Sequence, residues 1–71
     1  MNLAVDIGNT QIKFGLFDGD KLEEVVLQET AIDQILSKHK INFAIVSKTG
    51  ANDEIENKLK QKKINTFLLS H

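Results

Sequence analysis

The spacing of apolar residues changes at Thr30, and this change limits the fold more than any other feature of the sequence. Before Thr30, apolar residues form short runs or alternate with polar ones, which predicts strands. After it, two segments carry apolar residues every three to four positions, which predicts helices. The expected strands cover 3–7, 11–17, 21–28, 42–47 and 65–69, and the expected helices follow Thr30 and Asn52.

The connections between these segments determine the arrangement of the sheet. The first three strands are joined by tight turns, one of them Asp18-Gly19, so they should be antiparallel. The two later strands each follow a helix, so they should run parallel to the first strand. We therefore predict an α/β fold of order βββαβαβ, with a mixed five-stranded sheet in the order 3-2-1-4-5. This layout is that of a ribonuclease-H-like half-domain.

The expected helix ends carry the residues that stabilise helix termini. Thr30 is the predicted N-cap of the first helix, and His39 lies near its end on the apolar stripe, where a structural role is expected. Asn52 is the predicted N-cap of the second helix. Acidic residues follow Asn52 and lysines gather toward position 63, so the charges complement the helix dipole. Only Ile55 and Leu59 mark the buried face of this second helix.

Composition excludes several classes of function. Nine lysines and no arginine stand against ten acidic residues, which gives a net charge of -1 and argues against a nucleic-acid binder. The absence of cysteine excludes disulfides and thiolate zinc sites, and His39 and His71 lie too far apart in sequence to suggest a metal cluster. No run approaches the roughly 20 apolar residues that a membrane span needs. We expect a cytoplasmic protein with no membrane or nucleic-acid partner.

The segment 6–10, Asp-Ile-Gly-Asn-Thr, is the strongest candidate for a functional site. Asp6 comes at the end of a strand, where a carboxylate can hold a hydrated Mg²⁺ close to the phosphates of a nucleotide. Gly8 lets backbone N–H groups approach phosphate oxygens because no Cβ intervenes. Asn9 and Thr10 add neutral donors, and Lys13 adds a positive charge at the rim. The alternative is that Asp6 and Asn9 only stabilise a tight turn.

Residues 1–13, MNLAVDIGNTQIK, resemble the opening of the type III pantothenate kinases, also called the Bvg accessory factor family. The match is dense from Leu3 to Phe17, and the expected order of elements follows that family as far as Leu69. These enzymes belong to the superfamily of acetate kinase, sugar kinases, Hsp70 and actin. The Asp-x-Gly-Asn-Thr motif is more specific than the generic Asp-x-Gly-Thr of the superfamily.

The resemblance implies two ribonuclease-H-like halves with ATP between them, phosphorylation of pantothenate in coenzyme A synthesis, and a homodimer. It also implies a Mg²⁺ ion and a monovalent cation such as K⁺. Asp6 would be the carboxylate on the Mg²⁺ and phosphate side and would hold the ion through water. Gly8, Asn9 and Thr10 would line the phosphate loop, and Lys13 would be a rim contact.

Two departures from the family pattern support an alternative function. Gln11 stands where a basic residue is common, and the segment 47–50, Ser-Lys-Thr-Gly, stands where Ser-Ser-Val is common. The general base, the Gly-x-Asp-Arg segment and the second phosphate motif of the family do not occur in residues 1–71. We therefore expect these residues to form the amino-terminal half-domain alone and to be inactive by themselves. One alternative is a non-catalytic regulatory or structural relative of the same fold, and another is a different kinase of the superfamily with another acceptor.

Overall fold

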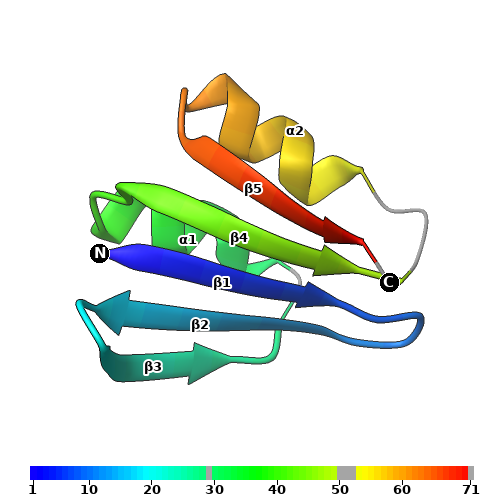
Figure 1. Ribbon diagram of the computed structural model, residues 1–71, viewed down its shortest axis with the longest axis horizontal. Helices are drawn as coiled ribbons and strands as arrows, with labels where there is room; N and C mark the ends of the chain where they lie inside the picture. Colours follow the sequence, from blue (N-terminus) through cyan, green and yellow to red (C-terminus); the bar gives the residue numbers. More distant parts are fainter. Residues whose placement is uncertain (29, 50–52, 71) are drawn as a thin grey trace.

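The computed structural model describes residues 1–28, 30–49 and 53–70. Its elements follow one another in the predicted order (Figure 1). They are β1 (Asn2–Ile7), β2 (Ile12–Asp18), β3 (Lys21–Val26), α1 (Ala31–Lys38), β4 (Phe43–Lys48), α2 (Glu54–Gln61) and β5 (Asn65–Ser70). Within these ranges, no helix has the length and apolar character needed to cross a bilayer.

The strands form one sheet in the order β3-β2-β1-β4-β5, which confirms the predicted arrangement. β1 is central and pairs antiparallel with β2 and parallel with β4. β5 is parallel to β4, and β3 is antiparallel to β2. The pairing of β2 with β3 shifts between Leu16 and Phe17, and this irregularity accounts for the broken apolar alternation in the sequence of β3.

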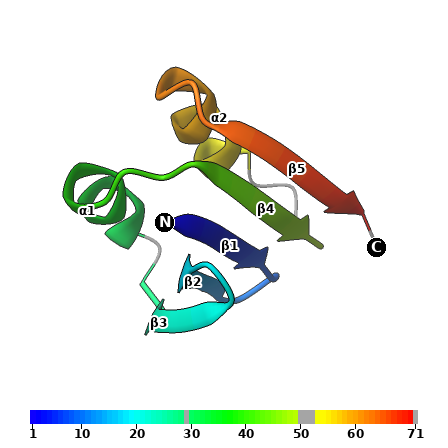
Figure 2. The ribbon, with the colours of Figure 1, turned by 60° about the vertical axis from the view of Figure 1, so that its left-hand side comes forward.

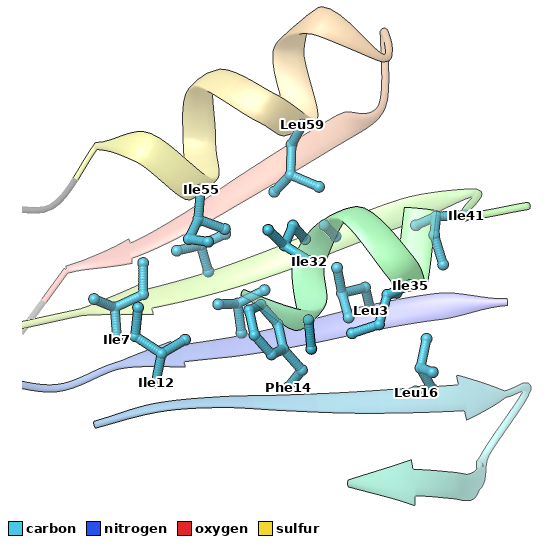
Figure 3. Close-up of a cluster of buried hydrophobic side chains, with 14 residues drawn as sticks. Leu3, Ile7, Ile12, Phe14, Leu16, Ile32, Ile35, Ile41, Ile55 and Leu59 are labelled. Carbon is cyan, nitrogen blue, oxygen red and sulfur yellow. The ribbon is translucent and has the colours of Figure 1, made fainter. Parts of the chain in front are cut away.

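Both helices lie on the same face of the sheet (Figure 2). Alternate residues of β1, β2 and β4 point toward the helices and form a single apolar cluster with them (Figure 3). The largest fully buried side chains of this core are Phe14, Leu3, Ile7, Leu16, Ile32, Ile55, Leu59 and Val46. Because strand side chains alternate between faces, the intervening residues point to the opposite face, which no helix of the described ranges covers.

Neither helix begins with a side-chain capping hydrogen bond. Thr30 does occupy the N-cap position of α1, but its side chain makes no capping hydrogen bond, because its own backbone is helical (φ -72°, ψ -9°). The predicted cap Asn52 lies outside the described residues. Asp53 stands at the N-cap of α2 and also makes no capping bond, since its carboxylate binds Lys48 instead.

The end of α2 has a feature that the sequence pattern did not reveal. Lys63 adopts a positive φ of 58°, and its N–H donates to the carbonyl of Lys60. The N–H of Ile64 donates to the carbonyl of Leu59, which completes a Schellman motif. This motif satisfies carbonyl groups of the last turn and directs the chain into β5.

The aromatic residues are divided between the two faces of the sheet. All four phenylalanines lie on expected strands, which predicts them in the core, but only Phe14 is fully buried there. Phe17 and Phe43 are partly buried on the opposite face, and Phe67 is 57% exposed. Phe43 and Phe67 instead contact each other edge to face, with ring centroids 5.8 Å apart. The expectation was wrong for these three because each has the strand parity that points away from the helices.

Candidate functional site

Three polar residues lie side by side on the face of the sheet that the helices leave open. Asp6 in β1 is the direct neighbour of Lys13 in β2 and of Ser47 in β4. All three therefore point to the same face, near the end of the sheet where β1 and β4 terminate. Asp6 and Lys13 are both exposed. Within the described ranges, neither of them forms an ion pair, so both remain available to a ligand.

A groove of about 410 Å³ runs across this open face. The small residues Ala4 and Gly15 form its middle, because they sit opposite each other on β1 and β2. Larger apolar side chains flank them, and Asp6, Lys13 and Ser47 supply its polar lining. Small residues between bulkier ones leave space above a sheet, so the carboxylate of Asp6 faces a groove that is open to solvent.

The loop from Gly8 to Gln11 joins β1 to β2 beside this polar row. The N–H of Gly8 donates to the carbonyl of Gln11 at 2.9 Å, which closes the loop on itself. A Cβ at position 8 would lie 3.2 Å from that same carbonyl oxygen. The close approach of two backbone segments thus disfavours a side chain at position 8, and the N–H of Gly8 is already used within the loop.

The next two residues of the loop differ from Gly8. The side chains of Asn9 and Thr10 are exposed, and among the described residues no backbone carbonyl accepts a hydrogen bond from their N–H groups. These two N–H groups and the two side chains are therefore the donors that the loop can offer to an anion. The donors of a phosphate site would come from Asn9 and Thr10, while Gly8 shapes the loop.

The segment after β4 is fixed to the end of β1. Thr49 donates two hydrogen bonds to the carbonyl oxygen of Ile7, one from its N–H at 3.0 Å and one from its hydroxyl at 3.2 Å. This double contact holds the start of the β4–α2 connection beside the loop that follows β1. No pattern in the sequence predicts this double contact.

Lys48 lies next to the site but points to the helix-covered face. Its ammonium group contacts the carboxylate of Asp53 at 2.5 Å and that of Glu56 at 2.7 Å. The pKa of Lys48 is raised above its ordinary value, mainly by its hydrogen bond to Asp53 and to a smaller extent by its hydrogen bond to Glu56. The bond from Lys48 in turn lowers the pKa of Asp53. Glu56 is 7% exposed, so this lysine neutralises a buried carboxylate and anchors α2.

The residues present fit a hydrated metal better than a directly coordinated one. Within the described residues, no three histidine, aspartate or glutamate side chains come together to hold a metal ion. Asp6 would therefore act as a single carboxylate toward a cation held mainly by water and phosphate, which is a common arrangement for Mg²⁺. The nearby Lys13 would add a further positive charge toward phosphate oxygens.

Four of the five predicted site residues offer groups to a ligand, and the fifth, Gly8, shapes the loop. Asp6 and Lys13 are brought together by strand pairing, and Asn9 and Thr10 lie in the adjoining loop. Gly8 is in the same loop but does not offer its N–H. A role for Ser47 in the site is doubtful from the sequence, although strand register places this residue directly beside Asp6.

No protein-family model matches this chain, and neither does any of the curated proteins with which it was compared.

Proposed function

We propose that this chain forms part of the nucleotide-binding half of an ATP-dependent kinase that resembles the type III pantothenate kinases. In this proposal the polyphosphate of ATP lies at the polar end of the open groove. Asp6 holds the hydrated Mg²⁺, the loop donors of Asn9 and Thr10 bind phosphate oxygens, and Lys13 contributes charge at the rim. Pantothenate as acceptor, K⁺, a cytoplasmic location and a homodimer belong to the same proposal and rest on the resemblance.

The chemistry of phosphoryl transfer suits such a site. Catalysis of this reaction consists mostly of positioning the phosphates and stabilising their charge. A Mg²⁺ ion held by Asp6 would supply positive charge that stabilises the negative charge of the transferring phosphoryl group. The residues of this chain orient that assembly: the carboxylate of Asp6 faces solvent at the groove, and its position is set by strand pairing on both sides. A rigid sheet holds such a group more precisely than a loop would.

The observation that carries the proposal is the cross-strand pair of Asp6 and Lys13, which lies beside a tight loop on the open face of the sheet. A carboxylate that served only the turn would point into the loop and accept its N–H groups. Asp6 lies instead within the regular part of β1, where it pairs with Lys13 and lines the groove. Its placement is therefore better explained by a ligand than by the turn.

Binding of Mg·ATP to wild-type and variant chains tests the proposal. Asp6→Asn removes the charge but keeps the size, and we expect it to weaken binding at least about tenfold, the equivalent of about 1.4 kcal/mol. Asp18→Asn is the matched control, because Asp18 is exposed at the opposite end of β2. Equal affinities in the two variants, or no binding to the wild-type chain, would contradict the proposal.

The isolated chain should bind nucleotide weakly and should not turn over ATP with pantothenate. The resemblance assigns the general base and the pantothenate contacts to segments other than 1–71. Incubation with Mg·ATP and pantothenate, followed by detection of ADP, measures this directly. Turnover above the background of a sample without protein would show that the assignment of roles is wrong.

A second candidate function is a non-catalytic relative of the same fold. The hydrogen bond between Gly8 and Gln11 favours it, since the glycine already has a structural reason to be there. Lys48 also favours it, because its ammonium group forms ion pairs with Asp53 and Glu56 and does not point to the open face where the phosphates would lie. Under this alternative, neither Asp6→Asn nor Asp18→Asn would change nucleotide binding, because there would be none to change.

A further inference from the structure

A second pocket, of about 340 Å³, lies at the end of the sheet where β4 and β5 begin. Each helix runs back along the sheet before the chain enters the next parallel strand, so the last turns of α1 and α2 both lie at this end (Figure 1). Asp6 is close to the opposite end, where β1 and β4 terminate. The pocket between the helix ends is therefore separate from the candidate site.

Three lysines line this pocket, and none of them has an acidic partner. Lys40, Lys62 and Lys63 are all exposed, and among the described residues they form no ion pair. No aspartate or glutamate of the described ranges lines the pocket. His39 lines it as well, and an imidazole gains a proton more readily when an anion is bound beside it. The pocket thus concentrates positive charge that the fold does not neutralise.

Two other lysines on the helix-covered side show the contrast with a structural role. Lys48 contacts Glu56 at 2.7 Å, and Lys58 contacts Asp33 at 2.9 Å. These lysines connect elements of the fold through carboxylates. The lysines of the pocket connect nothing, and like charges that gather around one cavity repel each other. An anion bound in the pocket would relieve this repulsion.

The backbone at Lys63 gives a second and independent reason to expect a ligand. Its φ of 58° is in the left-handed region, which glycine adopts freely and other residues adopt at a steric cost. Helices that end in a Schellman motif usually have glycine at this position, because the motif uses only the backbone. Lys58 and Lys60 already supply positive charge to the last turn of α2, so the helix dipole does not require Lys63.

The donors of the pocket are side chains, because the backbone N–H groups around it are used. The N–H groups of Lys62, Lys63 and Ile64 donate to carbonyls of α2, and that of His39 donates to the carbonyl of Ile35. Phosphate sites typically use free N–H groups at helix N-termini or the fork of an arginine, and the sequence has no arginine. Ammonium groups act as point charges without a fixed geometry, which suits separate carboxylates.

We propose that this pocket binds a small organic anion that carries two or more carboxylates on a hydrocarbon body. The carboxylates contact the three ammonium groups. The hydrocarbon body lies against the apolar part of the lining, which is formed by Leu36, Ile41 and Ile64. A volume of about 340 Å³ is within the range of small-molecule sites, about 300–1,000 Å³. This inference does not depend on the proposed kinase function, because it concerns the other end of the sheet.

Titration of citrate into the ¹⁵N-labelled chain, at constant ionic strength and without nucleotide, tests the pocket. Citrate carries three carboxylates on a short hydrocarbon body. We expect saturable shifts of amide resonances that are largest at His39 and Lys40 and at 62–64. Shifts that do not saturate, or that are largest near Asp6, would overturn the proposal. Inorganic phosphate is the comparison probe, and binding as tight as that of citrate would overturn the assignment to an organic carboxylate.

Two charge-matched variants separate a defined pocket from general attraction to a basic surface. Lys62→Gln and Lys38→Gln each remove one exposed lysine from the end of a helix, and only Lys62 lines the pocket. Lys62→Gln should weaken citrate binding about threefold, as the loss of an exposed ion pair does. Lys38→Gln should have a clearly smaller effect. Equal losses in the two variants would overturn the proposal.

Lys63→Gly separates ligand binding from stability. Glycine suits the left-handed backbone at this position, so without citrate the midpoint of thermal unfolding should be no lower than that of the wild type. Citrate binding should nevertheless weaken about threefold, because one ammonium group is lost. A lower midpoint with unchanged affinity would show that Lys63 serves the fold, and it would overturn the role that the proposal gives this residue.

Discussion

The two faces of the sheet are built from alternate residues of the same strands, yet they have different chemistry. In β1, Val5 is 2% exposed within the apolar core, and the next residue, Asp6, is exposed on the open face. In β2, Phe14 is completely buried, whereas its neighbour Lys13 lines the groove. The helix-covered face therefore determines the fold, and the open face is free to carry polar groups that contribute little to stability.

The same division separates the charged residues by role. On the helix-covered face, the buried Glu56 is neutralised by Lys48, so its charge is satisfied inside the protein. On the open face, Asp6 and Lys13 are neighbours without an ion pair in the described structure. A charge with an internal partner stabilises the fold, and a charge without one at a groove can serve a ligand.

The largest effect is expected from removing a phenyl ring from the covered face. Phe14→Ala should lower the free energy of unfolding by about 3–5 kcal/mol, because it deletes a fully buried ring. Phe17→Ala is the matched variant on the open face of the same strand, where the ring is only partly buried, and it should cost less than half as much. Urea unfolding measures both. Equal losses would mean that the open face contributes to the core.

A smaller effect is expected from the buried acid of the covered face. Glu56→Gln leaves Lys48 with one carboxylate partner and should cost about 1–3 kcal/mol, the range for disrupting a buried hydrogen bond. Glu54→Gln, two residues earlier with a side chain 63% exposed, is the control and should cost less than about 1 kcal/mol. If both substitutions have the same effect, the contact with Lys48 does not anchor α2.

The contact between Lys48 and Asp53 gives a smaller effect that depends on pH. The pKa of Asp53 is lowered from 3.8 by Lys48, so the unfolded chain binds the proton more readily than the folded one. The stability that this carboxylate contributes is therefore present above pH 3.8 and is lost as pH falls through the lower pKa of the folded state. The difference in unfolding free energy between wild type and Asp53→Asn should shrink below pH 3.8; a constant difference would contradict the assignment.

The smallest effect on stability is expected at the candidate site itself. Asp6→Asn should change the free energy of unfolding by no more than about 0.5 kcal/mol, because Asp6 is exposed and has no ion-pair partner among the described residues. Thermal unfolding of this variant beside Glu56→Gln tests the division of roles between the two acids. A loss at Asp6 as large as that at Glu56 would show that Asp6 is part of the structural framework.

Most of the fold could be predicted from the sequence because its signals are local. The alternation in β2 and the turn at Asp18-Gly19 indicate the hairpin, and the change of period at Thr30 indicates the helix and the crossover. Together with the rules for strand connections, these signals give the strand order that the structure has. The caps of the helices were less predictable, since Asp53 binds a lysine of another element instead of its own helix.

The candidate site was only partly predictable, because it depends on contacts between distant segments. The motif at 6–10 identified Asp6, Asn9 and Thr10, but no local signal indicates that Gly8 donates its N–H within the loop. The position of Ser47 beside Asp6 follows from the parallel pairing of β1 with β4, which joins residues far apart in sequence. The engagement of Lys48 by two acids could not be read from spacing alone.

Nuclear magnetic resonance of the ¹⁵N-labelled chain during a titration with Mg·ATP tests most directly whether the open face binds a polyphosphate. We predict that the largest shifts of amide resonances occur at Asp6, at Asn9 and Thr10, and at Lys13, with little change on the helix-covered face. Asp6→Asn should remove these shifts. Largest shifts at the lysines that end α2, or none at any nucleotide concentration, would contradict the account.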